Sequence, residues 1–123
     1  MRIPRKMRTI RNYRRVGRSL FKTRQKGEEQ VKVYIAGKIT GNPDYKQQFA
    51  EAEKKLREKG HTTMNPAVLP DGFEHHEYMR VCFSMIDVCD AVFFLSNWKE
   101  SKGAYMEYIY AFEQNKGIMF EEG

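Results

Sequence analysis

VKVYIAGKITG, at residues 31–41, is the stretch around which the rest of the chain is organised. It begins with alternating β-formers and becomes small and flexible around Gly37 and Gly41, which predicts a strand that runs into a glycine-rich turn. The next residues, Asn42, Pro43 and Asp44, are typical of the start of a helix. This order points backbone N–H groups and a helix dipole at one spot, which indicates an anion site. A tight turn without a ligand is the alternative, and the stretch alone favours neither.

Residues 45–120 continue with apolar patterns that alternate between helix and strand. The helical patterns cover about residues 45–59, 74–88 and 102–115, and the strand-like runs cover about residues 61–64, 91–95 and 117–120. The order predicts an α/β fold, a three-layer sandwich in which helices cover a short parallel sheet of about four strands. We expect one such domain over residues 31–123.

Ligands of parallel sheets bind at the carboxyl ends of the strands. In this chain that edge is expected to gather residues 37–41, Asn65, residues 96–98 and the first turn of the last helix. Asp87 and Asp90 are close enough in the sequence to suggest a catalytic pair of carboxylates, but they fall at the opposite edge of the sheet. We expect them to be a helix-end residue and a strand-start residue.

The positive charge of the chain is concentrated at its N-terminus. The formal net charge is +6, but residues 1–30 hold 11 of the 22 Lys and Arg residues and two of the 16 acidic residues. The remainder is mildly acidic, so nucleic-acid binding would have to rest on residues 1–30. This segment is expected to be a basic extension, either disordered, which its composition favours, or an amphipathic helix that binds nucleic acid, a membrane surface or a partner.

A third interpretation of the basic extension concerns the start of the protein. Residues 26–29, KGEE, can be encoded by a purine-rich stretch that would serve as a bacterial ribosome-binding site, and Val31 can then be a GTG start codon. On this hypothesis the native protein begins at residue 31. The intact mass of the protein from its natural host tests the hypothesis, and a species that contains Arg2 to Gln30 would contradict it.

The cysteines and histidines indicate no disulfide and no metal site. Cys82 and Cys89 lie seven residues apart in one expected helix, about 10 Å along its axis, which is too far for a disulfide. They are expected to be buried thiols in a reducing compartment. The pair His75 and His76 lacks the spacing of metal ligands, so we expect neither a metal nor a cofactor. No apolar run approaches 18 residues and no signal-peptide core is present, which predicts a cytoplasmic protein.

The last predicted helix carries one acid, Glu107, on a mostly apolar and aromatic surface. The residue falls in the second turn, within reach of the strand ends. A carboxylate there can attack an anomeric carbon and form a glycosyl-enzyme intermediate. A solvent-facing glutamate is the alternative, and spacing alone favours it.

Three motifs carry a resemblance to a known family: VYIAGKITG at residues 33–41, CDAVFFL at residues 89–95, and S-K-G-A-x-x-E-x-x-x-A at residues 101–111. In this order they resemble the nucleoside 2-deoxyribosyltransferase-like group, above all a small branch found in phage and bacterial genomes. The resemblance covers about residues 31–120. It implies a flavodoxin- or Rossmann-like fold, a homo-oligomer, and a small-molecule nucleoside or nucleotide as partner.

The resemblance also implies roles for individual residues. Glu107 corresponds to the glutamate nucleophile that takes the deoxyribosyl group, and Tyr34 to a tyrosine that orients it. Trp98 is expected either to stack on a base or to be a packing plug. The loop after the first strand is similar to the loop that holds the 5′-phosphate in deoxynucleotide N-glycosidases, with Lys38 as its positive charge. The expected binding set is Gly37, Lys38, Ile39, Thr40, Gly41, Asn65, Trp98, Ser101 and Gly103.

The chain departs from the family pattern at two acidic positions. Members of the family carry aspartates where this chain has Cys82 and Ser101, and a thiol protonates a leaving base far less well than a carboxylic acid does. His75, His76 or Glu77 can take over this role. Three hypotheses follow: deoxyribosyl transfer or N-glycosidic cleavage on a deoxynucleoside or its 5′-monophosphate, a non-catalytic nucleotide-binding module, and nucleic-acid binding through residues 1–30.

Overall fold

A computed structural model describes residues 30–122 of the 123-residue chain. The basic extension, except for Gln30, lies outside the described residues. The interpretations given for it therefore stay predictions. The described part alternates strands with helices and short 3-10 turns. Its elements are β1 (Lys32–Ala36), α2 (Tyr45–Glu58), β2 (Thr62–Met64), η1 (Pro66–Val68), α3 (His75–Asp87), β3 (Ala91–Phe94), η2 (Trp98–Glu100), α4 (Lys102–Glu113) and β4 (Gly117–Phe120).

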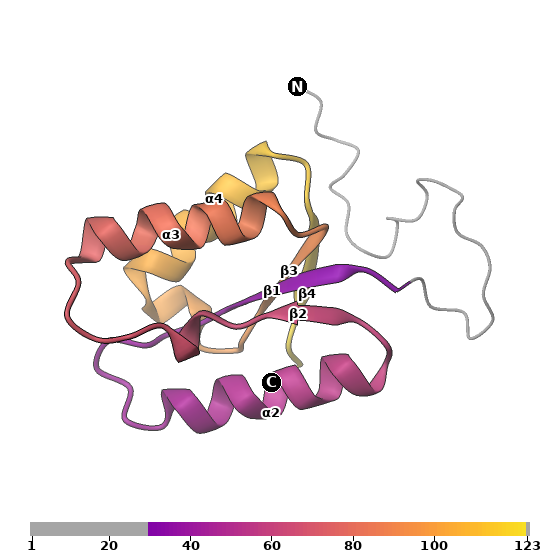
Figure 1. Cartoon of the computed structure of the whole chain (residues 1–123), viewed down its shortest axis with the longest axis horizontal. Coiled ribbons are helices and arrows are strands. Elements are labelled where there is room, and N and C mark those ends of the chain that lie inside the picture. Colours follow the sequence, from indigo (N-terminus) through magenta and orange to yellow (C-terminus); the bar gives the residue numbers. More distant parts are fainter. Residues whose placement is uncertain (1–29, 123) are drawn as a thin grey trace.

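The four strands form one parallel sheet in the order β2-β1-β3-β4. Helix α2 covers one face of the sheet, and α3 and α4 lie side by side over the other (Figure 1). The predicted three-layer α/β sandwich with a short parallel sheet is therefore confirmed. None of the described helices is both long enough and apolar enough to cross a membrane.

The sheet order creates a crevice at the end of β1. The chain leaves β1 through α2 toward β2, then crosses back through α3 to pair β3 with the other side of β1. Right-handed crossovers in opposite directions place their helices on opposite faces of the sheet. The loops after β1 and β3 therefore diverge, and this is the position at which open α/β sheets bind ligands.

The alternation along β1 decides which side chains face which helices. Val33 and Ile35 pack in a cluster with Phe49 and Leu56 of α2. Tyr34 points to the other face, into the cluster that includes residues of α3 and α4. The strand is buried on both faces, as expected of a parallel strand between two layers. Tyr34 is thereby directed toward Cys82 of α3 and Glu107 of α4.

The boundaries of the helices have local causes. At the start of α3, Glu74 and Glu77 form a capping box, and Ser101 caps α4 through its side chain. Gly60, just beyond α2, has a φ of +95°, the left-handed conformation that ends helices. The last helix ends two residues before the predicted boundary, at Glu113, because the chain turns left-handed at Asn115, whose φ is 61°.

The amino edge of the sheet holds the two aspartates that the sequence placed there. Asp87 ends α3 and accepts a hydrogen bond from the Tyr110 hydroxyl, at 2.6 Å. Asp90 precedes β3 and accepts one from the backbone N–H of Lys32, at 2.9 Å. Their predicted structural positions are confirmed, as are the two buried, free thiols.

Gly37, the first residue after β1, is required by close packing. A Cβ built on it would lie 2.6 Å from Cδ1 of the buried Leu95 and 3.0 Å from its Cβ. We expect Gly37→Ala to lower the free energy of unfolding by about 2 kcal/mol, since an inserted methyl in a packed core forces its neighbours to move. Urea denaturation measures the change.

Gly103→Ala is the matched control for this prediction. A Cβ at Gly103 would make ordinary contacts, the nearest 3.4 Å from Sδ of Met79. Because alanine also favours a helix more than glycine does, the Gly103 variant is expected to be at least as stable as the wild type. Equal stabilities of Gly37→Ala and the wild type would contradict the packing argument.

Candidate functional site

A pocket of about 610 Å³ opens at the carboxyl edge of the sheet. Its walls come from the end of β1, the loops after β1 and β2, the N-terminal parts of α2, α3 and α4, and the end of the loop before α4. This volume falls within the range of about 300–1,000 Å³ that is usual for small-molecule pockets. The lining includes the residues that matter most for the chemistry of the site: Tyr34, Gly37, His75, Cys82, Gly103 and Glu107.

Glu107 lies in the wall of this pocket and is only 6% exposed. It shares the buried face of α4 with two alanines, Ala104 and Ala111, at the i−3 and i+4 positions. Its Oε2 accepts a hydrogen bond of 2.7 Å from the hydroxyl of Tyr34. The solvent-facing position that spacing favoured is therefore wrong, because the small residues on either side bring this face of α4 against the sheet.

Burial controls the protonation of the Glu107 carboxyl. It raises the pKa of Glu107 from 4.5 to about 7, and hydrogen bonds from Tyr34 and Cys82 oppose that rise. Burial and then the charge of Glu107 raise the pKa of Cys82 to about 12, and the same two causes raise the pKa of Tyr34. At neutral pH the tyrosine and the thiol therefore keep their protons and donate hydrogen bonds to Glu107. The carboxyl group of Glu107 itself changes its protonation state near this pH.

A carboxyl group in this state has two chemical uses. As a carboxylate with little solvation, it is a nucleophile that loses little hydration when it attacks. As an acid with a pKa near 7, it can give or take a proton at physiological pH. In both cases the Tyr34 hydroxyl donates a hydrogen bond to Oε2 of the carboxyl group, which lies in the wall of the pocket.

The glycine-rich loop borders the pocket and is held by amide side chains. Gly37, Ile39 and Thr40 belong to the lining. The Lys38 backbone donates to Oδ1 of Asn97 at 3.1 Å, and its carbonyl accepts from Nδ2 of Asn42 at 2.8 Å. Both asparagines also donate to Oε1 of Gln48 in α2, at 2.9 and 3.3 Å.

Gln48 has no signal in the sequence that would identify this role. It is a polar residue on a helix with many polar residues, and only the packing of α2 under the loop brings its amide between the two asparagines. Asn97 lies in the segment that was expected at the carboxyl edge. Together these amides connect the loops after β1 and β3 across the crevice.

The positive charges are arranged differently from the prediction. Lys38 is outside the lining, and its Nζ lies 3.7 Å from Oε1 of Glu100. Lys102, the first residue of α4, lines the pocket instead. It lies beside Ser101, whose Oγ accepts a 3.0 Å hydrogen bond from the N–H of Ala104. Sequence reasoning did not single out Lys102, because nothing distinguishes it from other exposed lysines.

Three further residues of the predicted binding set lie outside the lining. The side chain of Asn65 caps η1 through the N–H of Ala67, at 2.8 Å, and donates to Glu53, at 3.1 Å. Gly41 has a φ of +77° and serves the turn. Trp98 is 9% exposed and packs against Phe94 and Tyr108, its ring centroid 5.1 and 4.9 Å from theirs. This is the packing plug that was the alternative to base stacking.

The second wall of the pocket is apolar and was not anticipated. It consists of Tyr45 and Phe49 of α2 with Pro66, Ala67 and Leu69 beyond β2. A pocket with one apolar wall and one wall of polar and titratable groups is typical of a site for a small amphipathic molecule. Within residues 30–122 there is no group of three or more His, Cys, Asp or Glu side chains that could hold a metal ion.

Comparison with families and known proteins gives the following matches. The model of a family described as "Domain of unknown function (DUF4406)" matches residues 31–120. None of the curated proteins matches the sequence.

The solved structures that are similar to this chain include two enzymes. They are a 2-desoxiribosyltransferase from Leishmania mexicana, with a TM-score of 0.58 and 19% identity, and a 2-deoxyribosyltransferase from Bacillus psychrosaccharolyticus, with a TM-score of 0.56 and 23% identity. Each alignment covers 72% of this chain, and 62% and 70% of those chains respectively. This chain thus spans less than two thirds of the Leishmania protein. At these identities the likeness establishes the fold.

Proposed function

The chain belongs to the family described as Domain of unknown function (DUF4406), and we propose that it cleaves the N-glycosidic bond of a deoxynucleoside or a deoxynucleoside 5′-monophosphate. The observation that carries the proposal is Glu107, a carboxyl group with 6% exposure in the wall of a pocket large enough for a nucleotide. The fold of the chain, which is similar to that of 2-deoxyribosyltransferases, supports the choice of substrate.

The proposed reaction has two steps. A Glu107 oxygen attacks C1′ of the sugar, the bond from C1′ to the base breaks, and a glycosyl ester forms. Water or a second base then attacks C1′ and releases the carboxylate. The Tyr34 hydroxyl, 2.7 Å from Oε2 of Glu107, orients this nucleophile. Its hydrogen bond also stabilises the negative charge of the carboxylate before the ester forms and after it is hydrolysed. Water as acceptor makes the chain a hydrolase, and a base makes it a transferase.

The lining suggests how the substrate is held. The sugar lies against α4, next to Glu107, and the base lies against the apolar wall formed by Tyr45, Phe49 and Leu69. A 5′-phosphate is held near the glycine-rich loop, whose Gly37, Ile39 and Thr40 line the pocket. Lys38 contributes to the potential there while it pairs with Glu100.

Release of free base from a panel of deoxynucleosides and their 5′-monophosphates tests this function. The full chain is incubated with each compound, alone and with a second base, and the products are separated by chromatography. We expect release from at least one deoxy compound and none from its ribo counterpart. No release from any compound would contradict the proposal.

A binding module without chemistry is the second candidate. It is favoured by the two positions without a carboxylic acid, since Cys82 carries a thiol and the Ser101 hydroxyl caps α4. On this hypothesis calorimetry detects nucleotide binding, Glu107→Gln leaves the affinity nearly unchanged, and no base is released. Any turnover that depends on Glu107 excludes it.

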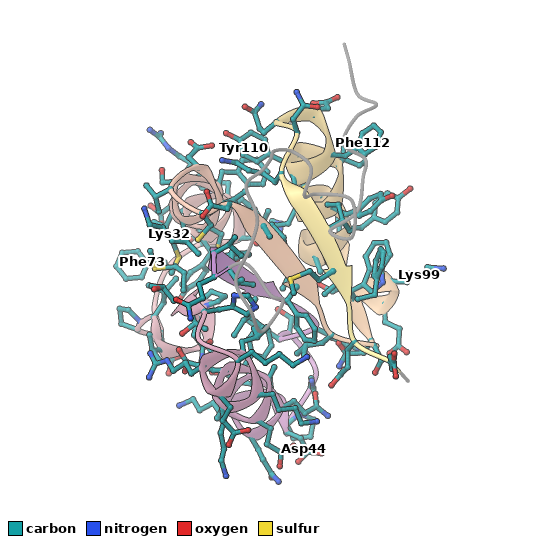
Figure 2. The ribbon with its side chains drawn as sticks, turned by 90° about the vertical axis from the view of Figure 1, so that its right-hand side faces the viewer. Lys32, Asp44, Phe73, Lys99, Tyr110 and Phe112 are labelled. Carbon is teal, nitrogen blue, oxygen red and sulfur yellow. The ribbon has the colours of Figure 1, made fainter. Side chains whose placement is uncertain are left out.

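We also propose that the chain forms a homo-oligomer through the outer face of α4 and strand β4. Tyr108 and Tyr110 pack within the domain, whereas Tyr105, Phe112 and Phe120 are 50%, 37% and 51% exposed. Figure 2 shows Phe112 and Lys99 pointing outward on the same side of the molecule. Light scattering gives the mass in solution, and a monomer at assay concentration would contradict this proposal.

A further inference from the structure

Cleavage of a glycosidic bond leaves an electron pair on the departing base, and the base leaves readily only if it receives a proton. This requirement follows from the proposed function, on which the inference rests. The groups around Glu107 do not meet it. Tyr34 and Cys82 hold the nucleophile through hydrogen bonds, and burial raises the pKa of both well above neutral. Ser101 accepts a hydrogen bond from the backbone of α4 and has no acidic proton near neutral pH.

One stripe of α3 lies beside one stripe of α4 in the wall of the pocket. His75, Met79 and Cys82 recur at i, i+4 and i+7 on α3, and all three line the pocket. Gly103 and Glu107 stand four residues apart on α4 and line it too. Cys82 is opposite Glu107, to which it is hydrogen-bonded.

His75 lies opposite Gly103, one helical turn from the nucleophile. A Cβ built on Gly103 would lie 3.6 Å from Cε1 of His75 and 3.4 Å from Sδ of Met79. The imidazole therefore rests on the glycine at the start of α4. The turn between Gly103 and Glu107 rises about 6 Å, which is close to the distance from C1′ to the far edge of a base. A base attached to a sugar at Glu107 can thus reach the imidazole.

We propose that His75 is the proton donor for the leaving base. In the first step the imidazolium gives its proton to a ring nitrogen or exocyclic oxygen of the base as the bond to C1′ breaks and Glu107 forms the ester. In the second step the neutral imidazole takes a proton from the attacking water, whose oxygen bonds to C1′ while Glu107 is released. Both groups return to their starting state, and because His75 is exposed at the pocket rim it can also exchange protons with solvent.

Two neighbouring candidates are excluded by their positions. His76 does not line the pocket, and Glu77 is used in the capping box at the start of α3, where its Oε1 accepts from the N–H of Glu74 at 2.8 Å. Glu100 lines the rim but pairs with Lys38. Asp71 also lines the rim, from the loop before α3, and it is the group that the experiment must separate from His75.

The test compares two leaving groups. An unmodified deoxynucleoside needs a proton on its base, whereas 7-methyl-2′-deoxyguanosine carries a cationic base that departs as a neutral molecule without one. We expect His75→Gln to lower the release of unmodified base by about 100-fold or more, the usual contribution of a general acid. In a single turnover, with enzyme in excess, its release of 7-methylguanine should fall less than about threefold, since the first step then needs no acid and the second step follows release of the base. Rates across bases of decreasing basicity give a second measurement, with a steeper dependence in the variant.

Matched variants keep the outcome decisive. His76→Gln changes the adjacent, exposed histidine outside the lining and should leave both rates unchanged, and Glu107→Gln should abolish both. Equal losses for the two substrates in His75→Gln, or no loss, would overturn the role of His75. A leaving-group effect in Asp71→Asn instead would assign the proton to Asp71. No release by the wild type from any substrate would contradict the proposed function itself, which is a distinguishable result.

Discussion

Glu107→Gln is expected to lower the rate of base release by at least about a thousandfold, because removing a nucleophile removes the covalent route altogether. The substitution keeps the size of the side chain, and its amide oxygen still accepts the Tyr34 hydrogen bond that is 2.7 Å long in the wild type. A glutamine amide does not form the glycosyl ester. The loss should therefore appear in turnover, while binding of the nucleotide changes little.

Chromatography of released base measures this effect, with wild type and variant assayed side by side. The control is Glu113→Gln, an exposed acid at the end of the same helix, which should retain wild-type turnover. Rapid acid quench followed by intact-mass measurement should reveal a deoxyribosyl adduct in the wild type and none in Glu107→Gln. A variant that retains more than a tenth of the wild-type rate would show that Glu107 is not the nucleophile.

The same substitution is expected to stabilise the protein at pH 8. The pKa of Glu107 is raised from 4.5 to about 7, so the folded state binds its proton more tightly than the unfolded state does. Between these two pH values the unfolded chain ionises first, and the wild type loses stability as the pH rises. The loss reaches about 3 kcal/mol above pH 7 and is absent below about pH 4.

Urea denaturation of wild type and Glu107→Gln between pH 4 and pH 8 isolates this contribution. The difference in unfolding free energy should be small at pH 4, grow through the range from 4.5 to 7, and then become constant. A difference that does not change with pH would mean that the carboxyl group titrates normally in the folded protein.

Glu107→Gln is thus expected to lower turnover and to raise stability, and both effects have one cause. A carboxylate in a pocket with few charged partners is poorly solvated, which costs stability and increases its reactivity. If the site were only structural, a glutamine or an apolar residue would serve better at this position. A substitution that stabilises the fold while it abolishes turnover is the result expected of a functional residue.

Much of the architecture could be predicted because it depends on local patterns. The alternating β-formers of residues 31–35 and the apolar run at residues 91–95 indicated strands, and Phe49, Ala52 and Leu56 marked the inner face of α2. The strict alternation of strand and helix then left a parallel sheet with helices on both faces as the physically reasonable arrangement. The carboxyl edge followed, and with it the region of the site.

The residues of the site were less predictable because their roles depend on packing between distant segments. Lys38 was expected to face a phosphate, yet its Nζ lies 3.7 Å from Glu100, 62 positions further along the chain. Lys102 lines the pocket in its place. Trp98 was expected either at a base or in the core, and only the surrounding rings, including Phe94 and Phe120, place it among packed side chains.

The sequence by itself determined the fold, the edge of the sheet at which the pocket lies, and the order of its motifs, because these follow from periodicity and from the handedness of the chain. Only the tertiary structure decided which face of α4 is buried, and so that Glu107 is 6% exposed and bonded to Tyr34. It also placed His75, and not His76, in the lining. Spacing defines the faces of a helix, whereas packing against other elements decides which face is turned inward.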